Sequence, residues 1–314
     1  MNRAGEATTS PEAEVEPRES FGWNYGGQAV LEGVLMRGAH QAAIAVRRPD
    51  NGEIVVKTEP VSALYRGPIS RIPFLRGIPM LWDALGLGMR ALFYSAEVVG
   101  QAEDPDFTLE DGRGLATGGF SLLAGVALFM LLPTWVAGWI VQGSDLLFNV
   151  VEGLIRLTIL VGYMAAVGQM EEIRRVFAYH GAEHATVNAY EDGAPLTVDG
   201  VRPYSTAHAR CGTAFLLLVV LISILVFLPF GKPPFLIRVA TRLLMVPVIS
   251  GIAYEVLRFT GKHAEHPVIR WLIKPNLALQ RLTTRQPDDE MLEVAITALQ
   301  AGLEKEKASA PAQE

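Results

Sequence analysis

Four long apolar segments dominate the middle of this chain. Residues 117–141 and 213–230 contain no charged residue, and residues 145–170 and 235–257 are nearly as apolar but carry a few charges. A helix that spans a bilayer needs about 20 apolar residues, which these segments can supply. Buried helices of a large soluble core are the alternative, and the close pairing of apolar runs disfavours it. The pattern predicts an α-helical polytopic membrane protein with four transmembrane helices within residues 117–260.

Basic residues fall on one side of the predicted membrane. Lys and Arg cluster before the first segment, between the second and third, and after the fourth, whereas the two short connections on the other side hold Lys232 alone. Cytoplasmic loops carry an excess of Lys and Arg. The N-terminus, the middle loop and the C-terminus are therefore all predicted to be cytosolic.

The segment before the first span is predicted to contain three parts. Residues 1–20 hold five Glu and no apolar core, which indicates a disordered acidic tail rather than a signal peptide. Residues 21–65 predict a small cytosolic β unit, because two β-rich runs flank the turn sequence Asp50-Asn51-Gly52. Within residues 66–116, apolar positions recur at helical spacing between residues 78 and 98, which predicts an amphipathic helix lying on the membrane.

The segment after the fourth span is predicted to be cytosolic and helical over residues 261–306. Its acidic start at Asp288 and an apolar stripe that ends at Leu303 indicate an amphipathic helix. Residues 307–314 are predicted to be a disordered tail.

Composition and charge favour a membrane protein and disfavour a nucleic-acid-binding protein. Half of the residues are hydrophobic and the mean hydropathy is +0.26, which agrees with a membrane protein. The single cysteine, Cys211, cannot form an internal disulfide, as expected of a cytosolic position. The net charge of −6 and the lack of a basic–aromatic patch argue against nucleic-acid binding.

The middle loop, residues 171–212, contains a motif with metal-binding potential. His180 and His184 are four residues apart, so a helix places both imidazoles on one face, with Glu183 close to it. The order H-x-x-E-H is that of metallopeptidases in which the two His hold zinc and the Glu activates water. Glu191 returns to the same stripe seven residues after His184 and is a further candidate ligand.

A second pair of metal-binding residue types follows at the start of the third span. His208 and Cys211 are three apart, and imidazole and thiolate are both good zinc ligands. Glu255, in the last turn of the fourth span, is predicted to reach the same membrane face. The sequence predicts a divalent metal site, with zinc as the favoured ion. Four protein ligands would make it structural, and an open position would make it catalytic; both remain open here.

Charged residues within the predicted spans form a separate group. Glu152 and Arg156 are four apart on one helix and are predicted to pair. Arg238 lies near the outer end of its span, where it could reach the membrane surface. Arg242 is deeper and is the in-span charge with the strongest functional potential. The exposed pair His263 and His266 is better explained as part of a polar loop.

Four motifs in order resemble the YqhQ-like family of bacterial membrane proteins. They are GGQAVLEGVLMRG, YHGAEHATVNAYE, HARCGT and QRLTTRQPDDEMLEVAI, and the similarity extends from about residue 22 to residue 303. The family is a domain of unknown function that is often labelled a predicted metal-dependent enzyme. The resemblance implies a bacterial inner membrane location. The family pattern has Lys and Pro where this chain has Ala185 and Ala209, which leaves the candidate ligands intact.

Three functional hypotheses follow. The first is a metal-dependent hydrolase acting on a peptide, lipid or lipid-linked substrate, with Glu183 as the general base and Cys211 as a fourth ligand or a neighbour of the ligands. The second is a scaffold in which a structural metal fixes the middle loop while the cytosolic segments bind a protein partner. The third is a small transporter that uses Arg242 and Glu152, weakened by the absence of repeats or broken helices in the sequence.

Overall fold

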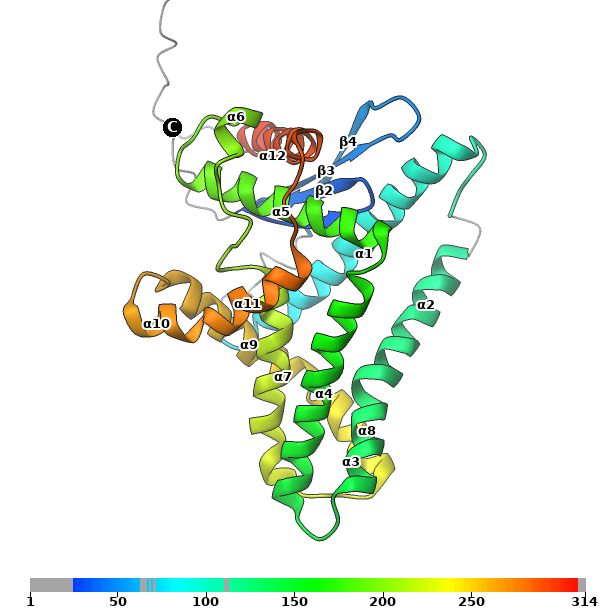
Figure 1. Cartoon of the computed structure of the whole chain (residues 1–314), viewed down its shortest axis with the longest axis vertical. Coiled ribbons are helices and arrows are strands. Elements are labelled where there is room, and N and C mark those ends of the chain that lie inside the picture. The colour runs from blue at the N-terminus through cyan, green and yellow to red at the C-terminus, as the bar shows by residue number, and fades with distance from the viewer. Residues whose placement is uncertain (1–24, 63–66, 68, 70–71, 110–112, 310–314) are drawn as a thin grey trace, which may run out of the picture.

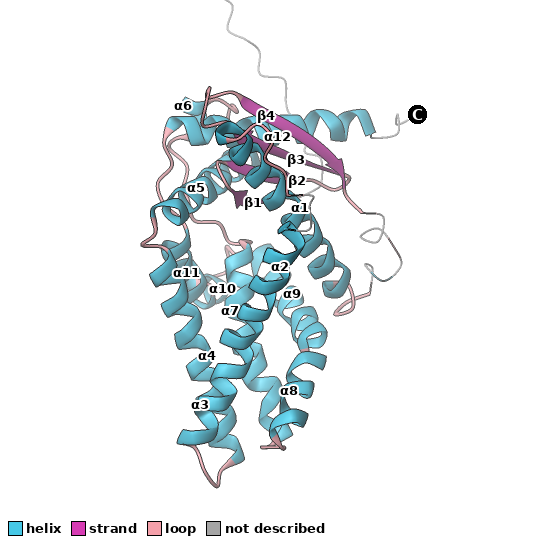
Figure 2. Cartoon of the chain, turned by 90° about the vertical axis from the view of Figure 1, so that its right-hand side faces the viewer, coloured by secondary structure: helices cyan, strands magenta, loops and turns pink. Residues whose placement is uncertain are grey.

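The structure is a computed structural model that describes residues 25–62, 67, 69, 72–109 and 113–309. A body built on a β-sheet lies at one end, and a bundle of long helices extends from it (Figures 1 and 2). The predicted acidic tail, residues 1–20, lies outside the described residues. Of the predicted C-terminal tail, residues 307–309 continue the last helix and the rest lies outside the description.

The N-terminal unit is an antiparallel sheet of four strands in the order β1-β2-β3-β4. The strands are β1 (Gly26–Val30), β2 (Gly33–Arg37), β3 (Gln41–Arg47) and β4 (Ile54–Pro60). The predicted hairpin is confirmed as β3 and β4, joined through Gly52 at a φ of 74°. The other two strands were not predicted individually, because their glycine-rich sequence indicates turns. They meet at a tight turn in which Glu32 takes a φ of 47°.

Helices cover both faces of this sheet. One face packs on α5 (Glu171–Glu191) and α12 (Asp289–Ser309), with Val34, Met36 and Ala45 in the shared core. The opposite face packs on α1 (Gly77–Glu103) through Leu35 and Ile44. Successive side chains of β2 and β3 therefore point into two different hydrophobic cores, as expected when a sheet is buried on both sides.

Helix α1 is apolar on two sides. One side packs on the sheet through Leu87, Ala91 and Val98, next to Asp83, which is 7% exposed and pairs with Arg37 at 2.7 Å. The other side faces outward, with Trp82 73% and Leu85 57% exposed. The predicted helix is present, and its contact with a membrane remains a prediction.

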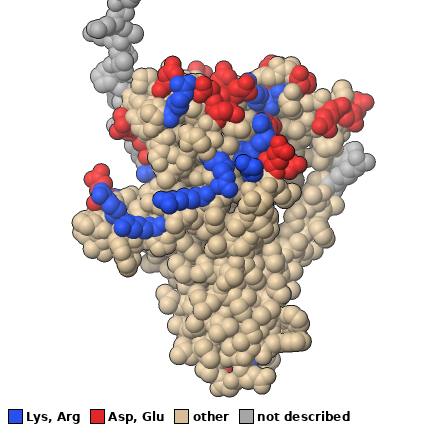
Figure 3. Space-filling view, viewed as in Figure 1, with Lys and Arg blue, Asp and Glu red and all other residues tan. Residues whose placement is uncertain are grey.

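Among the described residues, the bundle contains three helices long and apolar enough to cross a membrane, or four if a bent pair counts as one. The first runs from Ala116 to Ile140 through α2 (Arg113–Val126), the π-helical η3 (Ala127–Leu131) and α3 (Leu132–Ile140). The next two are α4 (Asp145–Val167) and α7 (Gly212–Phe227), the latter extended by η4 (Leu228–Phe230). The surface of this bundle carries few charges (Figure 3).

The fourth predicted span is broken. It consists of α8 (Phe235–Leu244) and α9 (Val246–Lys262), bent by 42° at Met245. Pro247 lies in the first turn of α9, and its missing N–H ends the regular ladder there. The expectation of unbroken spans is therefore wrong at this position, and one argument against a transporter falls with it. The short helices α6 (Val198–Val201), α10 (Pro267–Leu272) and α11 (Lys274–Thr283) complete the described elements.

Candidate metal centre

Helix α5 carries the H-x-x-E-H motif between the sheet and the bundle. The helix begins with Glu171 and Glu172, and acidic residues favour a helix N-terminus. Gly193, two residues after the helix ends, has a φ of 77°. As predicted from their spacing, the rings of His180 and His184 lie side by side, with centroids 4.4 Å apart.

Cys211 completes a group of three potential ligands. It is the N-cap of α7, and its Sγ lies 3.3 Å from Nε2 of His180. The ligand atoms of His180, His184 and Cys211 all lie within 4.8 Å of one another. Residues separated by 31 positions in the chain thus meet where α5 crosses the start of α7.

The tautomers of both histidines are fixed by their surroundings. Nδ1 of His180 lies 2.8 Å from the carbonyl oxygen of Thr283, and Nδ1 of His184 lies 2.6 Å from that of Thr206. A carbonyl can only accept, so Nδ1 carries the proton and donates in each ring. Nε2 of each ring therefore faces the shared centre while Nδ1 is held by a backbone carbonyl, as in metal-bound histidines.

Glu183 adds a carboxylate next to these nitrogens. Its Oε2 lies 3.5 Å from Nε2 of His184 and 4.0 Å from Nε2 of His180, and the residue is 3% exposed. Burial raises the pKa of Glu183, while His180, His208 and the backbone N–H of Gly27 act in the opposite direction. The carboxylate thus sits beside the potential ligands in a site with little water.

Gly27 makes room for Glu183. A Cβ at this position of β1 would come within 2.8 Å of Cγ of Glu183 and would also collide with the carbonyl of Leu35. Gly27 lies in the glycine-rich sequence of β1. Its role in admitting Glu183 could not be seen from the sequence, because it depends on β1 crossing α5.

His208 and Glu191 form a pair beside the three-residue group. Nε2 of His208 lies 3.6 Å from Oε2 of Glu191, and the ring centroids of His208 and His184 are 5.6 Å apart. Glu191 also pairs with Arg210. Although burial raises the pKa of Glu191, the His208 and Arg210 partners hold it below its usual value. His208 and Glu191 are therefore close to the potential ligands but hold each other.

Gln280 fixes the loop that carries His208. Its side chain accepts from the His208 N–H at 3.0 Å and donates to the His208 carbonyl at 2.8 Å. Gln280 is 1% exposed on α11. A single polar residue on an amphipathic helix gives no signal in the sequence, so this residue was missed.

Glu255 is held elsewhere. Its carboxylate accepts two hydrogen bonds from the Arg76 guanidinium, at 2.6 and 2.5 Å, and one from the backbone N–H of Phe74 at 3.1 Å. This arrangement ties α9 to the segment before α1. The structure therefore does not bring Glu255 to the group formed by His180, His184 and Cys211.

Three N and S ligands with an adjacent carboxylate are chemically suited to zinc. Catalytic zinc sites commonly have three protein ligands and one open position, and Cys with two His is one such set. Here, Glu183 is placed either to complete the coordination or to handle a proton beside the ion. The donor set fits the divalent metal predicted from the sequence.

Comparisons with known proteins support the resemblance seen in the sequence motifs. A family described as "Protein of unknown function (DUF1385)" matches residues 72–305. The chain is 36% identical over 289 residues to "Uncharacterized protein YqhQ" of Bacillus subtilis (strain 168), covering 87% of this chain and 90% of that protein. No solved structure matches the chain.

Proposed function

Because the chain belongs to the YqhQ-like family of proteins of unknown function (DUF1385), we propose a function from its own residues: a membrane-bound, metal-dependent enzyme of the hydrolase class. The observation that carries this proposal is the convergence of His180, His184 and Cys211, with Nε2 of both rings directed inward beside the Glu183 carboxyl group. Backbone carbonyls hold Nδ1 of both rings, which leaves the two Nε2 atoms for a shared ligand.

Each residue of the centre has a distinct role in this proposal. His180, His184 and Cys211 bind the ion, for which zinc is the best match to the donor set. A bound zinc ion supplies a Lewis acid that polarises a substrate oxygen. Glu183 would take a proton from the attacking water as general base and pass it to the leaving group as general acid. His208, with Glu191, lines the side of the centre next to His184.

The position of the centre favours a substrate from the membrane surface. The charged residues gather over the sheet domain, with Lys and Arg at its border with the uncharged bundle (Figure 3). This distribution supports the orientation with the centre on the cytosolic side of a bacterial inner membrane. The outward apolar stripe of α1 would rest on the lipid there. A peptide, lipid or lipid-linked molecule is the proposed substrate class.

Metal content tests the centre directly. Full-length protein purified in detergent without chelator should hold about one zinc per chain by elemental mass spectrometry. The double variant His180→Ala with His184→Ala should lose it. The matched control is His263→Ala with His266→Ala, which removes two exposed histidines outside the centre. Wild-type protein that neither contains nor takes up a divalent metal would refute the metal centre.

Glu183→Gln separates an enzyme from a scaffold with a structural metal. If Glu183 handles protons, the variant keeps its zinc and loses hydrolysis across a panel of ester, peptide and phosphoester substrates. If Glu183 is itself a fourth ligand of a closed site, the variant loses zinc affinity, and the scaffold becomes the better reading. Wild-type zinc protein with no hydrolysis that depends on Glu183 would also favour the scaffold.

A further inference from the structure

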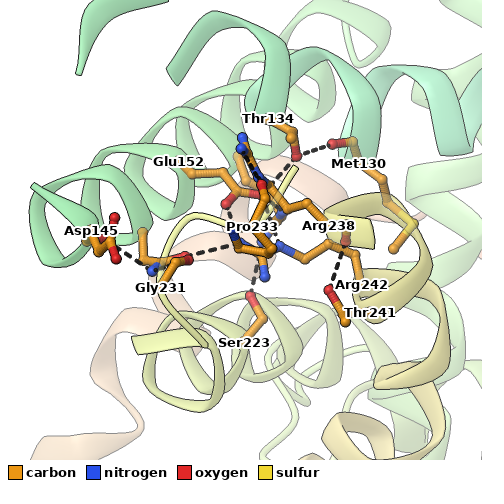
Figure 4. A network of polar contacts seen from close by, with 12 residues as sticks. Met130, Thr134, Asp145, Glu152, Ser223, Gly231, Pro233, Arg238, Thr241 and Arg242 are labelled. Carbon is orange, nitrogen blue, oxygen red and sulfur yellow. Dashed lines mark hydrogen bonds and ion pairs between the residues drawn. The ribbon is translucent and has the colours of Figure 1, made fainter. Parts of the chain in front are cut away.

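A second polar cluster lies inside the helical bundle, at the end away from the sheet (Figures 1 and 4). It draws on the first, second, third and fourth predicted spans. Each of its seven side chains is 8% exposed or less; they are Thr134, Asn149, Glu152, Arg156, Ser223, Arg238 and Arg242. Polar groups at such a position are costly unless they are paired or serve a ligand.

Glu152 is the acceptor at the centre of this cluster. Its carboxylate accepts from the hydroxyl of Thr134 at 2.8 Å and from Arg156 at 2.8 Å. It also accepts from Nε and Nη2 of Arg242, at 3.1 and 2.5 Å. The predicted pairing of Glu152 with Arg156 is confirmed, and Arg242 joins it. Three of these bonds end on Oε1 of Glu152 and one ends on Oε2.

Arg238 is stabilised by neutral groups, and Arg242, which is paired with Glu152, also stacks on an aromatic ring. Arg238 donates to the carbonyl of Pro233 at 2.7 Å and lies 4.4 Å from the centroid of the Phe148 ring. Arg242 lies 3.7 Å from the centroid of Phe227. Aromatic faces and carbonyls offset part of the cost of burying a cation. Neither type of group neutralises the charge.

The cluster carries an excess of positive charge. Among the described residues at this end of the bundle, two carboxylates, Asp145 and Glu152, stand against four cations, an excess of two; the cations are Arg156, Lys232, Arg238 and Arg242. Nη1 of Arg242 is also buried and has no hydrogen-bond partner among the described residues. A buried charge without a full set of partners is strongly unfavourable.

We propose that this cluster is a binding site for a phosphate-type oxyanion, held by the guanidinium groups of Arg238 and Arg242. The unpaired Nη1 of Arg242 is the donor that the anion would satisfy, and the anion would offset the excess charge. Guanidinium groups bind oxyanions through paired N–H donors, and the apolar surroundings strengthen that attraction. This site is independent of the metal centre proposed above.

The cluster is close enough to the membrane surface for such a ligand to reach it. Glu152 lies seven residues into α4, which begins at Asp145, so it is about 10 Å from that end. Lys232, in the loop that precedes α8, donates to the carbonyl of Val141 and marks the outer side of the cluster. The phosphate could belong to a lipid headgroup of that leaflet or be a free ion.

Thermal unfolding of the full-length protein in detergent tests the site. Potassium phosphate is titrated against potassium chloride at equal ionic strength, and micelles with phosphatidylglycerol are compared with micelles that contain diacylglycerol, a lipid without phosphate. Saturable stabilisation by phosphate supports a free-ion site, and stabilisation by phosphatidylglycerol alone supports a headgroup site. In either case, the affinity should fall about tenfold or more in Arg242→Lys, which keeps the charge but loses the paired donors.

Two further variants keep the test decisive. Arg238→Gln removes one cation without touching Glu152 and should weaken anion binding even if Arg242→Lys folds poorly. Arg258→Gln, an exposed residue of α9, is the matched control and should leave the anion response unchanged. The proposal is overturned if neither additive stabilises the wild type saturably, or if the response is the same in Arg238→Gln as in the wild type.

Discussion

The two buried polar clusters of this protein are built in opposite ways. In the metal centre, the outer atoms of each ring are occupied by backbone carbonyls and the inner atoms point at a common spot. In the bundle, the Glu152 carboxylate is paired with Arg156 and Arg242. Nη1 of Arg242 is buried and has no hydrogen-bond partner among the described residues. The first cluster directs its potential ligand atoms toward one point, whereas most polar groups of the second cluster bond to one another and connect neighbouring helices.

This difference predicts different costs of substitution in the two clusters. Loss of a side chain from the candidate metal centre should change what the protein binds more than how stably it folds. Loss of a side chain that pairs with Glu152 should also lower stability strongly, because a buried charge would be left without its partner. Three substitutions test this difference, and a fourth lies outside both clusters.

The largest expected effect is on stability, from breaking the ion pair of the bundle. Arg242→Leu leaves Glu152 buried beside Arg156 alone, and we expect a loss of about 3–5 kcal/mol in unfolding free energy. Denaturation in mixed detergent micelles measures it. Adding Glu152→Leu removes the partner as well, so the double variant should lose less than the sum of the two single variants. A double variant as unstable as the sum of the two single variants would contradict direct coupling.

The second effect connects the sheet to the metal centre. Gly27→Ala places a methyl group against Glu183 and the Leu35 carbonyl, and we expect it to cost about 1–3 kcal/mol and to lower zinc affinity. Gly26→Ala is the matched control, because a Cβ there meets nothing within 4 Å. Thermal unfolding measures the loss of stability, and zinc titration measures the loss of zinc affinity. Equal behaviour of the two variants would show that β1 does not constrain Glu183.

The third effect should be confined to the metal. The hydroxyl of Thr213 lies 3.1 Å from Sγ of Cys211. Thr213→Val keeps the shape but removes this polar neighbour, so we expect about tenfold weaker zinc binding with little change in folding. Competition with a fluorescent chelator measures the affinity. An unchanged affinity would argue that Cys211 does not bind the ion as a thiolate.

The smallest effect lies outside both clusters. Burial raises the pKa of Glu306, but the backbone N–H groups of His40 and Gln41 and the His40 ring together hold it below the usual value of 4.5. A carboxyl group whose pKa is lowered in the folded state stabilises the fold at pH values above its ordinary pKa. This stabilisation is lost as the pH falls through the lowered pKa. Glu306→Gln should cost about 1 kcal/mol at pH 7 and flatten the loss of stability below pH 5. Glu304→Gln, at an exposed position of the same helix, should leave that pH profile unchanged.

The sequence predicted what periodicity and spacing encode, and it missed what depends on contacts between distant elements. The 3.6-residue period was enough to pair His180 with His184, and apolar length was enough to find the spans. Glu255 was a candidate ligand because it lies near the right membrane face, but position along a helix does not reveal that Arg76 holds it. The strands before Gln41 were hidden because glycine signals turns, although here it permits close packing of β1 on α5.

The order of synthesis follows from the docking of α12 on the sheet. Val34, Met36 and Ala45 near the start of the chain share a core with Leu292 and Leu299 of α12. The candidate spans lie between these two parts in the chain, so they are synthesised before the sheet acquires α12. Until then, α5 alone of these two helices covers this face of the sheet. The sheet, α5 and α12 therefore complete their common core late in synthesis.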